Sequence, residues 1–340
     1  MGCIVMVSKN RRSLSSTTRY NIFLFLVVLA FMVLFSLMNP KFLAPFNIFL
    51  LFRQNLPNMI IACAMVLVIT SGSIDLSVGG VMALASTSYA AICVAGVNPW
   101  FAILVIAVLG AVIGLINTFV IEKLKIPAFM ATIAGWLIYG GLAFIVCGGP
   151  NPIAKPAMQV ITVLDDKQLY IGPIPFAMTI AVIVVAIFLF IEKRTLLGKY
   201  AIAIGGNYNA AYYSGINVIK MRMIFYVLCS VMAALSGVWQ VARLSTADPR
   251  SIGLGVEFAV LSACIIGGAN IKGGQGSIIG AVMGVFLLAV LPNGIQLMKS
   301  ALPVWLQWLK SPFLPQVITG VVLLVVVFIN YLLGRGRNYE

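Results

Sequence analysis

Residues 70–82 read TSGSIDLSVGGVM and include Asp75, the only charged residue between Arg53 and Glu122. Glycine and serine surround Asp75, and both are poor residues for a helix interior, so we expect the backbone to break here. An ionised carboxylate in a bilayer core costs roughly 2.5–3.5 kcal/mol on insertion scales, and irregular backbone at that depth is tolerated only beside protein or water. The stretch therefore predicts a break between two membrane helices, facing the inside of the bundle.

The composition predicts an integral membrane protein. The 340 residues are 62% hydrophobic and only 9% charged, whereas about a quarter of the residues of a soluble domain are charged. The net charge of +14 could suggest nucleic acid. The basic residues lie in short flanks between apolar runs, however, and no basic helix is interleaved with aromatic residues, so we expect no nucleic-acid partner.

The apolar runs predict an all-α polytopic protein with about ten transmembrane helices, because about 20 apolar residues cross the hydrocarbon core. Uncharged runs of that order cover residues 20–38, 100–121, 174–191 and 313–333. Shorter runs, or runs richer in glycine, serine and proline, cover residues 56–71, 79–97, 127–147, 221–241, 256–268 and 277–298. The run at residues 20–38 is longer than the apolar region of a signal peptide, and no small-residue cleavage site follows it, so we expect it to remain as the first span.

The distribution of lysine and arginine predicts the orientation. With the N-terminus inside and ten crossings, the inner segments hold 14 of the 22 basic residues, whereas the acidic residues divide evenly. Cytoplasmic loops carry the excess of lysine and arginine, so both termini should be cytoplasmic. The predicted organisation is an N-terminal tail (1–19), a transmembrane domain (20–333) with a cytoplasmic loop (192–220), and a C-terminal tail (334–340).

Several kinds of chemistry are excluded by the residues present. The chain has no histidine, and its six cysteines form no C-x-x-C pair, so Ser-His-Asp catalysis, histidine-ligated haem and the usual zinc sites are not expected. We expect the cysteines to pack as small apolar residues, and predict neither catalytic nor metal-binding residues. No P-loop is present, because Gly198-Lys199 is followed by tyrosine. A pump built on this chain must therefore use the ATPase of a partner.

Asp75 has two interpretations, which the sequence leaves open. It precedes a helix of small residues, where a carboxylate can accept from free backbone N–H groups as a structural cap. Alternatively, it lines the path of a solute.

A second break is predicted at residues 267–284, GGANIKGGQGSIIGAVMG. Counting the two breaks as five spans apart gives an odd offset, which would turn one copy upside down and is consistent with a 5+5 inverted repeat. Small residues four positions apart should allow helices to approach closely; they are Gly110, Gly114, Gly280 and Gly284.

The loop at residues 192–220 should hold a short helix after Gly206. Asn207 can cap this helix and Gly215 can end it. A helix outside the membrane at this place could dock a partner or could be a solvated connector.

Three ordered motifs resemble one family. GSIDLSVGG (72–80), AIGGNYNAAYYSGINV (203–218) and GGANIKGGQGSIIG (267–280) are similar to segments of the ribose/galactose/xylose-type permeases of bacterial ABC importers. The similarity runs from about residue 47 to residue 296. Three departures appear. Asn209 stands where the wider superfamily has an acid in E-A-A-x-x-x-G, and Ala269 stands where the third motif usually has the threonine of Gly-Thr-x-x-x-Gly-Gly. Residues 299–316 look like an expanded outer loop.

The resemblance implies a permease subunit in the bacterial inner membrane for a sugar or sugar-like solute. The implied partners are a second permease copy or paralogue, a cytoplasmic ATP-binding subunit, an extracytoplasmic sugar-binding protein and membrane lipid. ATP and magnesium would be used by the ATPase, and this chain would bind no cofactor. The resemblance places a substrate pathway or its hinges at Asp75, Ser77, Asn117, Gly79, Gly268, Gly273 and Gly274, and the contact with the ATPase at Gly205, Gly206, Asn209, Ala210, Ala211 and Gly215.

Two alternatives remain at the level of the sequence. An ion-coupled secondary transporter would also use Asp75 and an inverted repeat. A polytopic membrane enzyme would have to use Asp165 and Asp166, the adjacent acids of an outer loop.

Overall fold

The computed structural model describes residues 16–149, 153–154, 170–171, 174–298, 309, 311 and 313–335. The described residues form twelve α-helices and four two-residue strands, in agreement with the predicted all-α class. Asp165, Asp166 and most of the predicted outer segment 299–316 lie outside the described residues.

Each predicted span contains a helix. These helices are α1 (Ser16–Met38), α2 (Pro45–Thr70), α3 (Val78–Val94), α4 (Pro99–Thr118), α5 (Ala128–Cys147), α7 (Phe176–Arg194), α10 (Val218–Leu244), α11 (Val256–Ile266), α12 (Ile278–Leu297) and α13 (Leu314–Arg335). Among the described helices, six are long and apolar enough to cross a membrane: α1, α2, α4 with the π-helical turn Phe119–Lys123, α5, α10 and α12. The chain is therefore a polytopic membrane protein.

One predicted boundary is wrong, and one helix was not predicted. Helix α2 begins at Pro45 rather than at residue 56, so that Arg53 lies within the helix and not in a loop. The packing of α2 against α10 explains this, because the Trp239 indole of α10 donates to the Arg53 carbonyl at 3.3 Å. In the 192–220 loop, a helix not predicted from the sequence, α8 (Leu196–Gly206), precedes the predicted one, α9 (Tyr208–Tyr213).

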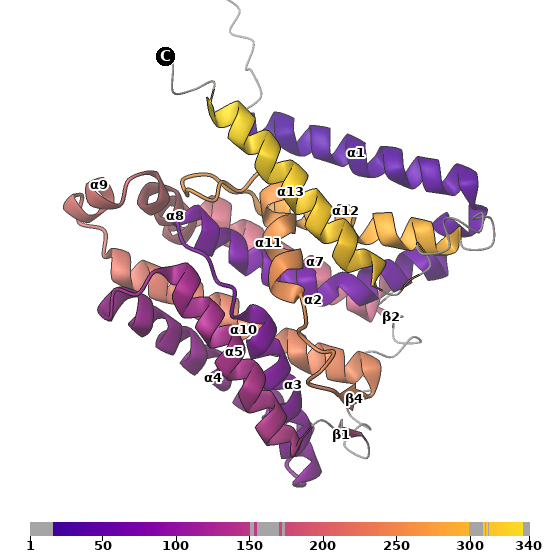
Figure 1. Ribbon diagram of the computed structural model, residues 1–340, viewed down its shortest axis with the longest axis horizontal. Helices are drawn as coiled ribbons and strands as arrows, with labels where there is room; N and C mark the ends of the chain where they lie inside the picture. The colour runs from indigo at the N-terminus through magenta and orange to yellow at the C-terminus, as the bar shows by residue number, and fades with distance from the viewer. Residues whose placement is uncertain are drawn as a thin grey trace, which may run out of the picture.

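The helices form two groups with α2 between them (Figure 1). One group consists of α3, α4, α5 and α10, and the other contains α1, α11, α12 and α13. Helices α8 and α9 project at one end of the bundle, and the paired strands β1 (Ile153–Ala154) and β4 (Thr246–Ala247) lie toward the opposite end. A second pair joins β2 (Tyr170–Ile171) to β3 (Ile174–Pro175).

Small residues set the closest helix contacts, as predicted. A Cβ atom on Gly114 of α4 would stand 2.6 Å from the Val227 Cα of α10, and one on Gly110 would stand 2.8 Å from the Ser230 carbonyl oxygen. Gly280 and Gly284 of α12 meet the backbone of Gly267 and Ala263 in the same way. Because any side chain would separate these backbones, the glycines hold each half of the bundle together.

Candidate functional site

Asp75 ends a chain of hydrogen bonds that crosses three elements. Its Oδ1 atom accepts from the Ser77 backbone N–H at 2.9 Å and from the Ser77 hydroxyl at 2.6 Å. Asn117 of α4 donates its amide to the Ser77 hydroxyl oxygen at 2.8 Å, and Tyr139 of α5 donates to the Asn117 amide oxygen at 2.9 Å. Each donor in this series points toward the carboxyl group, so three predicted site residues, Asp75, Ser77 and Asn117, form one network.

Asp75 closes the turn before α3 but does not cap the helix, because its carboxylate accepts from Ser77 and no described side chain bonds the free N–H groups of the first turn of α3. Asp75 is completely buried, and Ser77 is the residue from which α3 starts. Its second oxygen, Oδ2, has no nitrogen or oxygen partner among the described residues, and the buried Cys229 thiol of α10 lies beside the carboxyl group. In this conformation Asp75 therefore fixes the start of α3 and its contact with α4.

Four glycines bring the two helix breaks and the loop helices together at one point, here called the glycine junction: Gly72, Gly205, Gly273 and Gly274. A Cβ atom on Gly273 would stand 2.8 Å from the Cα atoms of both Gly72 and Gly205. One on Gly205 would overlap the Thr70 carbonyl oxygen, to which the Gly274 N–H donates at 2.8 Å. The three motifs singled out in the sequence thus meet in space.

The backbone conformation of the junction also requires glycine. Gly72, Gly273 and Gly274 have φ values of +76°, +90° and +78°, a region in which residues with a Cβ atom are strained. Substitution at Gly273 and Gly274 is therefore opposed both by the backbone and by close contacts, whereas at Gly72 it is opposed by the backbone alone.

Two other predicted glycines pack outside the junction. Gly79 of α3 lies against the backbone of Gly253 and the side chain of Glu257 at the start of α11. Gly268 lies under the Tyr20 ring of α1, whose hydroxyl donates to the Ile266 carbonyl at 2.8 Å. Gly79 thus packs at the start of α11, and Gly268 packs just after its end.

Arg222 of α10 connects the loop helix α9 to the first break. Its guanidinium donates to Glu122 at 2.9 Å and to the Ser71 carbonyl at 3.2 Å, and it lies 5.2 Å from the centre of the Tyr208 ring. The Glu122 side chain is only 4% exposed, and that of Arg222 is 16% exposed. We call Arg222, Glu122, Ser71 and Tyr208 the Arg222 clamp.

Helix α9 presents most of its surface outward. Asn207 caps it by accepting from the Ala210 N–H at 2.9 Å, and Gly215 follows with a φ of +84°, as the sequence predicted. Ala211 is buried against Ile204 and Val218, whereas Asn209 and Ala210 are exposed and Tyr213 is 85% exposed. Gly206, also a predicted contact residue, has open space around its Cα atom.

The two breaks do not behave as a pair of inverted copies. Gly72 of the first break and Gly273 of the second are in contact, so both breaks lie at the same place in the bundle. The count of five spans between the breaks was wrong: six of the predicted spans lie between them, an even offset that predicts both breaks on the same side of the membrane. The six are residues 79–97, 100–121, 127–147, 174–191, 221–241 and 256–268. The predicted 5+5 repeat therefore has no support from this pair of motifs.

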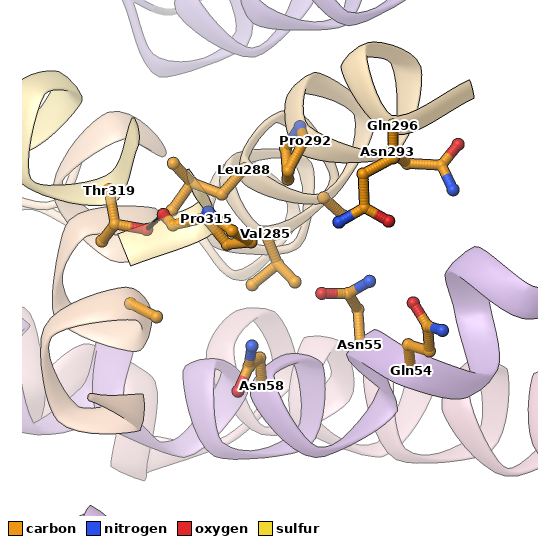
Figure 2. Close-up of a pocket in the computed structure, with 12 residues that line it drawn as sticks. Gln54, Asn55, Asn58, Val285, Leu288, Pro292, Asn293, Gln296, Pro315 and Thr319 are labelled. Atoms are coloured by element: carbon orange, nitrogen blue, oxygen red, sulfur yellow. Dashed lines mark hydrogen bonds between the residues drawn. The ribbon is translucent and has the colours of Figure 1, made fainter. Parts of the chain in front are cut away.

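A cavity of about 180 Å³ lies apart from these residues, between α2, α11, α12 and α13 (Figure 2). None of the site residues predicted from the sequence lines this cavity. Its walls carry amide side chains of α2 and α12, which face one another across the space.

Sequence reasoning missed the Arg222 clamp and this cavity. Glu122 and Arg222 are separated by 100 positions, and each has a lysine among its near neighbours, so neither was distinguished from an ordinary flanking charge. Uncharged polar residues around a proline inside an apolar helix could have indicated the cavity, at Pro57 of α2 and Pro292 of α12.

Comparison with known proteins gives consistent similarities. The profile of a family described as "Branched-chain amino acid transport system / permease component" matches residues 47–327. The ribose import permease of Bacillus subtilis (strain 168) is 35% identical over 307 residues, which cover 90% of this chain and 91% of that protein. The L-arabinose transport system permease of Escherichia coli (strain K12) is 30% identical over 79% of this chain and 78% of its own length. No solved structure matches the chain significantly.

Proposed function

The chain belongs to the branched-chain amino acid transport system / permease component family. From this membership and from the similarity to two sugar permeases, we infer that it forms the membrane path of an ABC importer for a sugar. The two relatives named above are described as ribose and L-arabinose permeases, which supports a pentose as the solute. As a permease the chain has no catalytic activity of its own.

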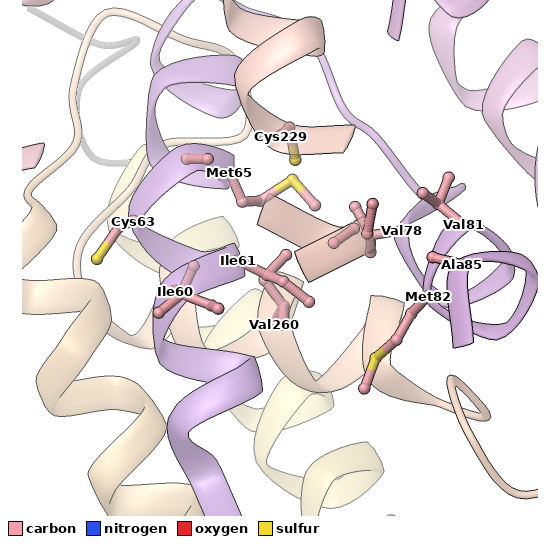
Figure 3. Close-up of a cluster of buried hydrophobic side chains, with 14 of the residues drawn as sticks. Ile60, Ile61, Cys63, Met65, Val78, Val81, Met82, Ala85, Cys229 and Val260 are labelled. Atoms are coloured by element: carbon pink, nitrogen blue, oxygen red, sulfur yellow. The ribbon is translucent and has the colours of Figure 1, made fainter. Parts of the chain in front are cut away.

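Helix α2 passes through three layers that such a path requires. Its first half lines the amide cavity, its second half is buried from Met59 to Thr70, and its end reaches the glycine junction. Figure 3 shows the middle layer, where Ile61 and Met65 lie near Val78 of α3 and Val260 of α11. This apolar layer separates the cavity from the glycine junction. In the proposal, the solute path is therefore closed between these two places in the conformation described.

The Arg222 clamp carries the coupling in this proposal. A push on α9 moves Tyr208, and Arg222 transmits the motion to the Ser71 carbonyl, one residue from Gly72 of the junction. Because α2 ends and α3 begins on either side of this break, a shift there tilts both helices. Asp75, Ser77 and Asn117 act as the hinge that keeps α3 joined to α4, and they do not contact the solute in the closed state.

The finer organisation is part of the same proposal. Ten helices cross the inner membrane with both termini in the cytoplasm, which places α9 on the cytoplasmic side. A cytoplasmic ATPase that binds ATP and magnesium contacts the exposed residues of the segment 206–215 of this chain, and a binding protein delivers the solute from the other side. A second permease copy or paralogue completes the path.

Uptake by reconstituted vesicles tests this function. Vesicles with the permease, its ATPase and its binding protein should accumulate D-ribose or L-arabinose when supplied with ATP, and should not accumulate L-leucine. Vesicles with the permease alone should accumulate none of them under an imposed proton or sodium gradient. Accumulation without the ATPase would show an ion-coupled transporter instead, and uptake of leucine alone would show an amino acid importer.

A further inference from the structure

The lining of the cavity contains hydrogen-bonding groups without charge. Its polar residues come from α2, α12 and α13, and its remaining residues are alanine, valine, leucine and proline. The polar set is Gln54, Asn55, Asn58, Asn293, Gln296 and Thr319. Among the lining residues that the structure describes there is no lysine, arginine, aspartate or glutamate.

Part of this polar lining is already hydrogen bonded within the protein. Asn293 exchanges amide hydrogen bonds with Asn47 at 3.0 and 3.1 Å, and Asn55 donates to the Leu51 carbonyl at 2.9 Å. Thr319 donates to the Pro315 carbonyl at 2.8 Å. These bonds fix the walls of the cavity.

Three amides remain free for another partner. The side-chain amides of Gln54, Asn58 and Gln296 form no hydrogen bond to any residue that the structure describes. Gln54 and Gln296 are exposed and Asn58 is half-buried, which places two of the free amides at the mouth and one deeper in the wall. An amide in the wall of a cavity that has no protein partner is satisfied by water or by a solute, and Asn58 is the one of the three that is partly withdrawn from the surface.

The two walls are built in the same way. Helices α2 and α12 each contain Leu-Pro-Asn, at residues 56–58 and 291–293, and in each helix the proline is internal. A proline removes the N–H that would bond to the carbonyl four residues earlier. In α2 that carbonyl, of Arg53, accepts from Trp239; in α12 it belongs to Leu288, which lines the cavity. Each helix therefore places an asparagine, Asn58 or Asn293, beside a local interruption of its backbone hydrogen bonds. The two asparagines lie on facing walls of the cavity (Figure 2).

We propose that this cavity is a solute-binding site of the permease and that it takes a neutral, polyhydroxylated molecule through Gln54, Asn58 and Gln296. An amide side chain both donates and accepts, which suits a hydroxyl group, and it carries no charge. A free amino acid carries an ammonium and a carboxylate, and burial of either without a charged partner is unfavourable. The site thus selects a sugar over an amino acid by the chemistry of its walls. This inference rests on the function proposed above and adds the place and chemistry of recognition.

Two leucine substitutions test the site in the complete reconstituted assembly. Asn58→Leu and Gln296→Leu each remove a free amide and keep a side chain of similar length. Uptake of D-ribose at subsaturating concentration should fall roughly three- to tenfold for each, while ATP hydrolysis stimulated by the binding protein persists. Gln316→Leu makes the same chemical change at an exposed residue of α13 outside the cavity, and uptake should stay at the wild-type rate.

The ratio of D-ribose uptake to D-xylose uptake separates recognition from general damage. The binding protein is unaltered, so a changed ratio in the Asn58 or Gln296 variant must arise in the permease. Wild-type uptake together with a wild-type ratio in both assembled variants would overturn the site. It would leave the proposed function intact, because that function fails only if the wild-type assembly does not take up sugar with ATP.

A labelling experiment tests the site even if the leucine variants do not assemble. Gln296→Cys places an exposed thiol at the mouth, whereas the described native cysteines are buried or half-buried. In the full chain, a high concentration of D-ribose should slow the reaction of this thiol with a maleimide, relative to L-leucine at the same concentration. Equal rates with both solutes would also overturn the site.

Discussion

Asp75 shows how a single carboxyl group can be kept inside a membrane protein. Two hydrogen bonds from Ser77 hold its Oδ1 atom, and Asn117 and Tyr139 extend the series of donors. The network ties the first break to α4 and α5, so the charge that stood out in the sequence has a structural task. The sequence could predict the break, because glycine and serine mark it locally. It could not predict the partners, because Asn117 and Tyr139 are placed by helix packing.

Asp75→Asn should weaken the subunit. The amide oxygen can still accept from Ser77, but the new NH₂ group would replace Oδ2, which has no nitrogen or oxygen partner among the described residues. An unsatisfied buried donor costs about 1–3 kcal/mol. The thermal midpoint of the purified subunit in detergent and its ATP-driven uptake should both fall. If both stay at wild-type levels, the network around Asp75 has no role in stability or transport.

The glycine junction gives a matched pair of substitutions. Gly205→Ala places a methyl group on the Thr70 carbonyl and the Gly274 N–H, whereas Gly206→Ala meets open space. Overpacking costs about 1–3 kcal/mol, and both substitutions share the intrinsic preference of alanine for helix. Thermal unfolding should show a clear loss of stability for Gly205→Ala and none for Gly206→Ala. Equal stability of the two variants would contradict the close contact.

At the scale of elements, α9 was predictable and α8 was not. Asn207 and Gly215 mark the ends of α9 by local chemistry that the sequence displays. Helix α8 contains Gly198, Gly205 and Gly206, which made the segment look like a loop. Close backbone packing explains these residues: Gly198 lies against the Glu192 backbone and Gly205 lies in the junction. The need for contact outweighed helix propensity here.

The exposed face of α9 should be the surface that meets the ATPase. Tyr213 is 85% exposed and Tyr212 is 61% exposed, and their rings are in edge-to-face contact. Truncation of an aromatic residue at the centre of an interface commonly costs 2 kcal/mol or more. Tyr213→Ala should therefore weaken ATPase binding at least about tenfold, measured by titration of the purified subunit.

A matched aromatic variant provides the control. Phe129→Ala on α5 removes a ring that is 55% exposed, and the affinity for the ATPase should not change. Equal affinity of the Tyr213→Ala variant and the wild type would remove α9 as the docking element. Ala211→Glu is a harsher test, because Ala211 is buried between α8 and α10; it should abolish transport while the subunit still inserts into the membrane.

At the scale of the molecule, α2 joins the parts of the site in one continuous helix. It carries the amide wall, the apolar layer and the first break in sequence. Composition and run lengths sufficed to predict the membrane class and the helices. The start of α2 was placed too late, because Arg53, Gln54 and Asn55 looked like a loop. In the structure these polar residues lie in a helix beside the cavity and α10, which explains why they are tolerated there.

The central claim is that motion of α9 reaches the helix break through Arg222. Arg222→Lys keeps the charge opposite Glu122 but loses the planar group that spans Ser71 and Tyr208, and a lysine does not replace such contacts. The direct measurement is the amount of D-ribose taken up per ATP hydrolysed by the complete assembly in vesicles. The account predicts that the Arg222→Lys assembly still hydrolyses ATP but takes up several-fold less sugar for each ATP. A wild-type ratio of uptake to hydrolysis in the assembled variant would contradict it.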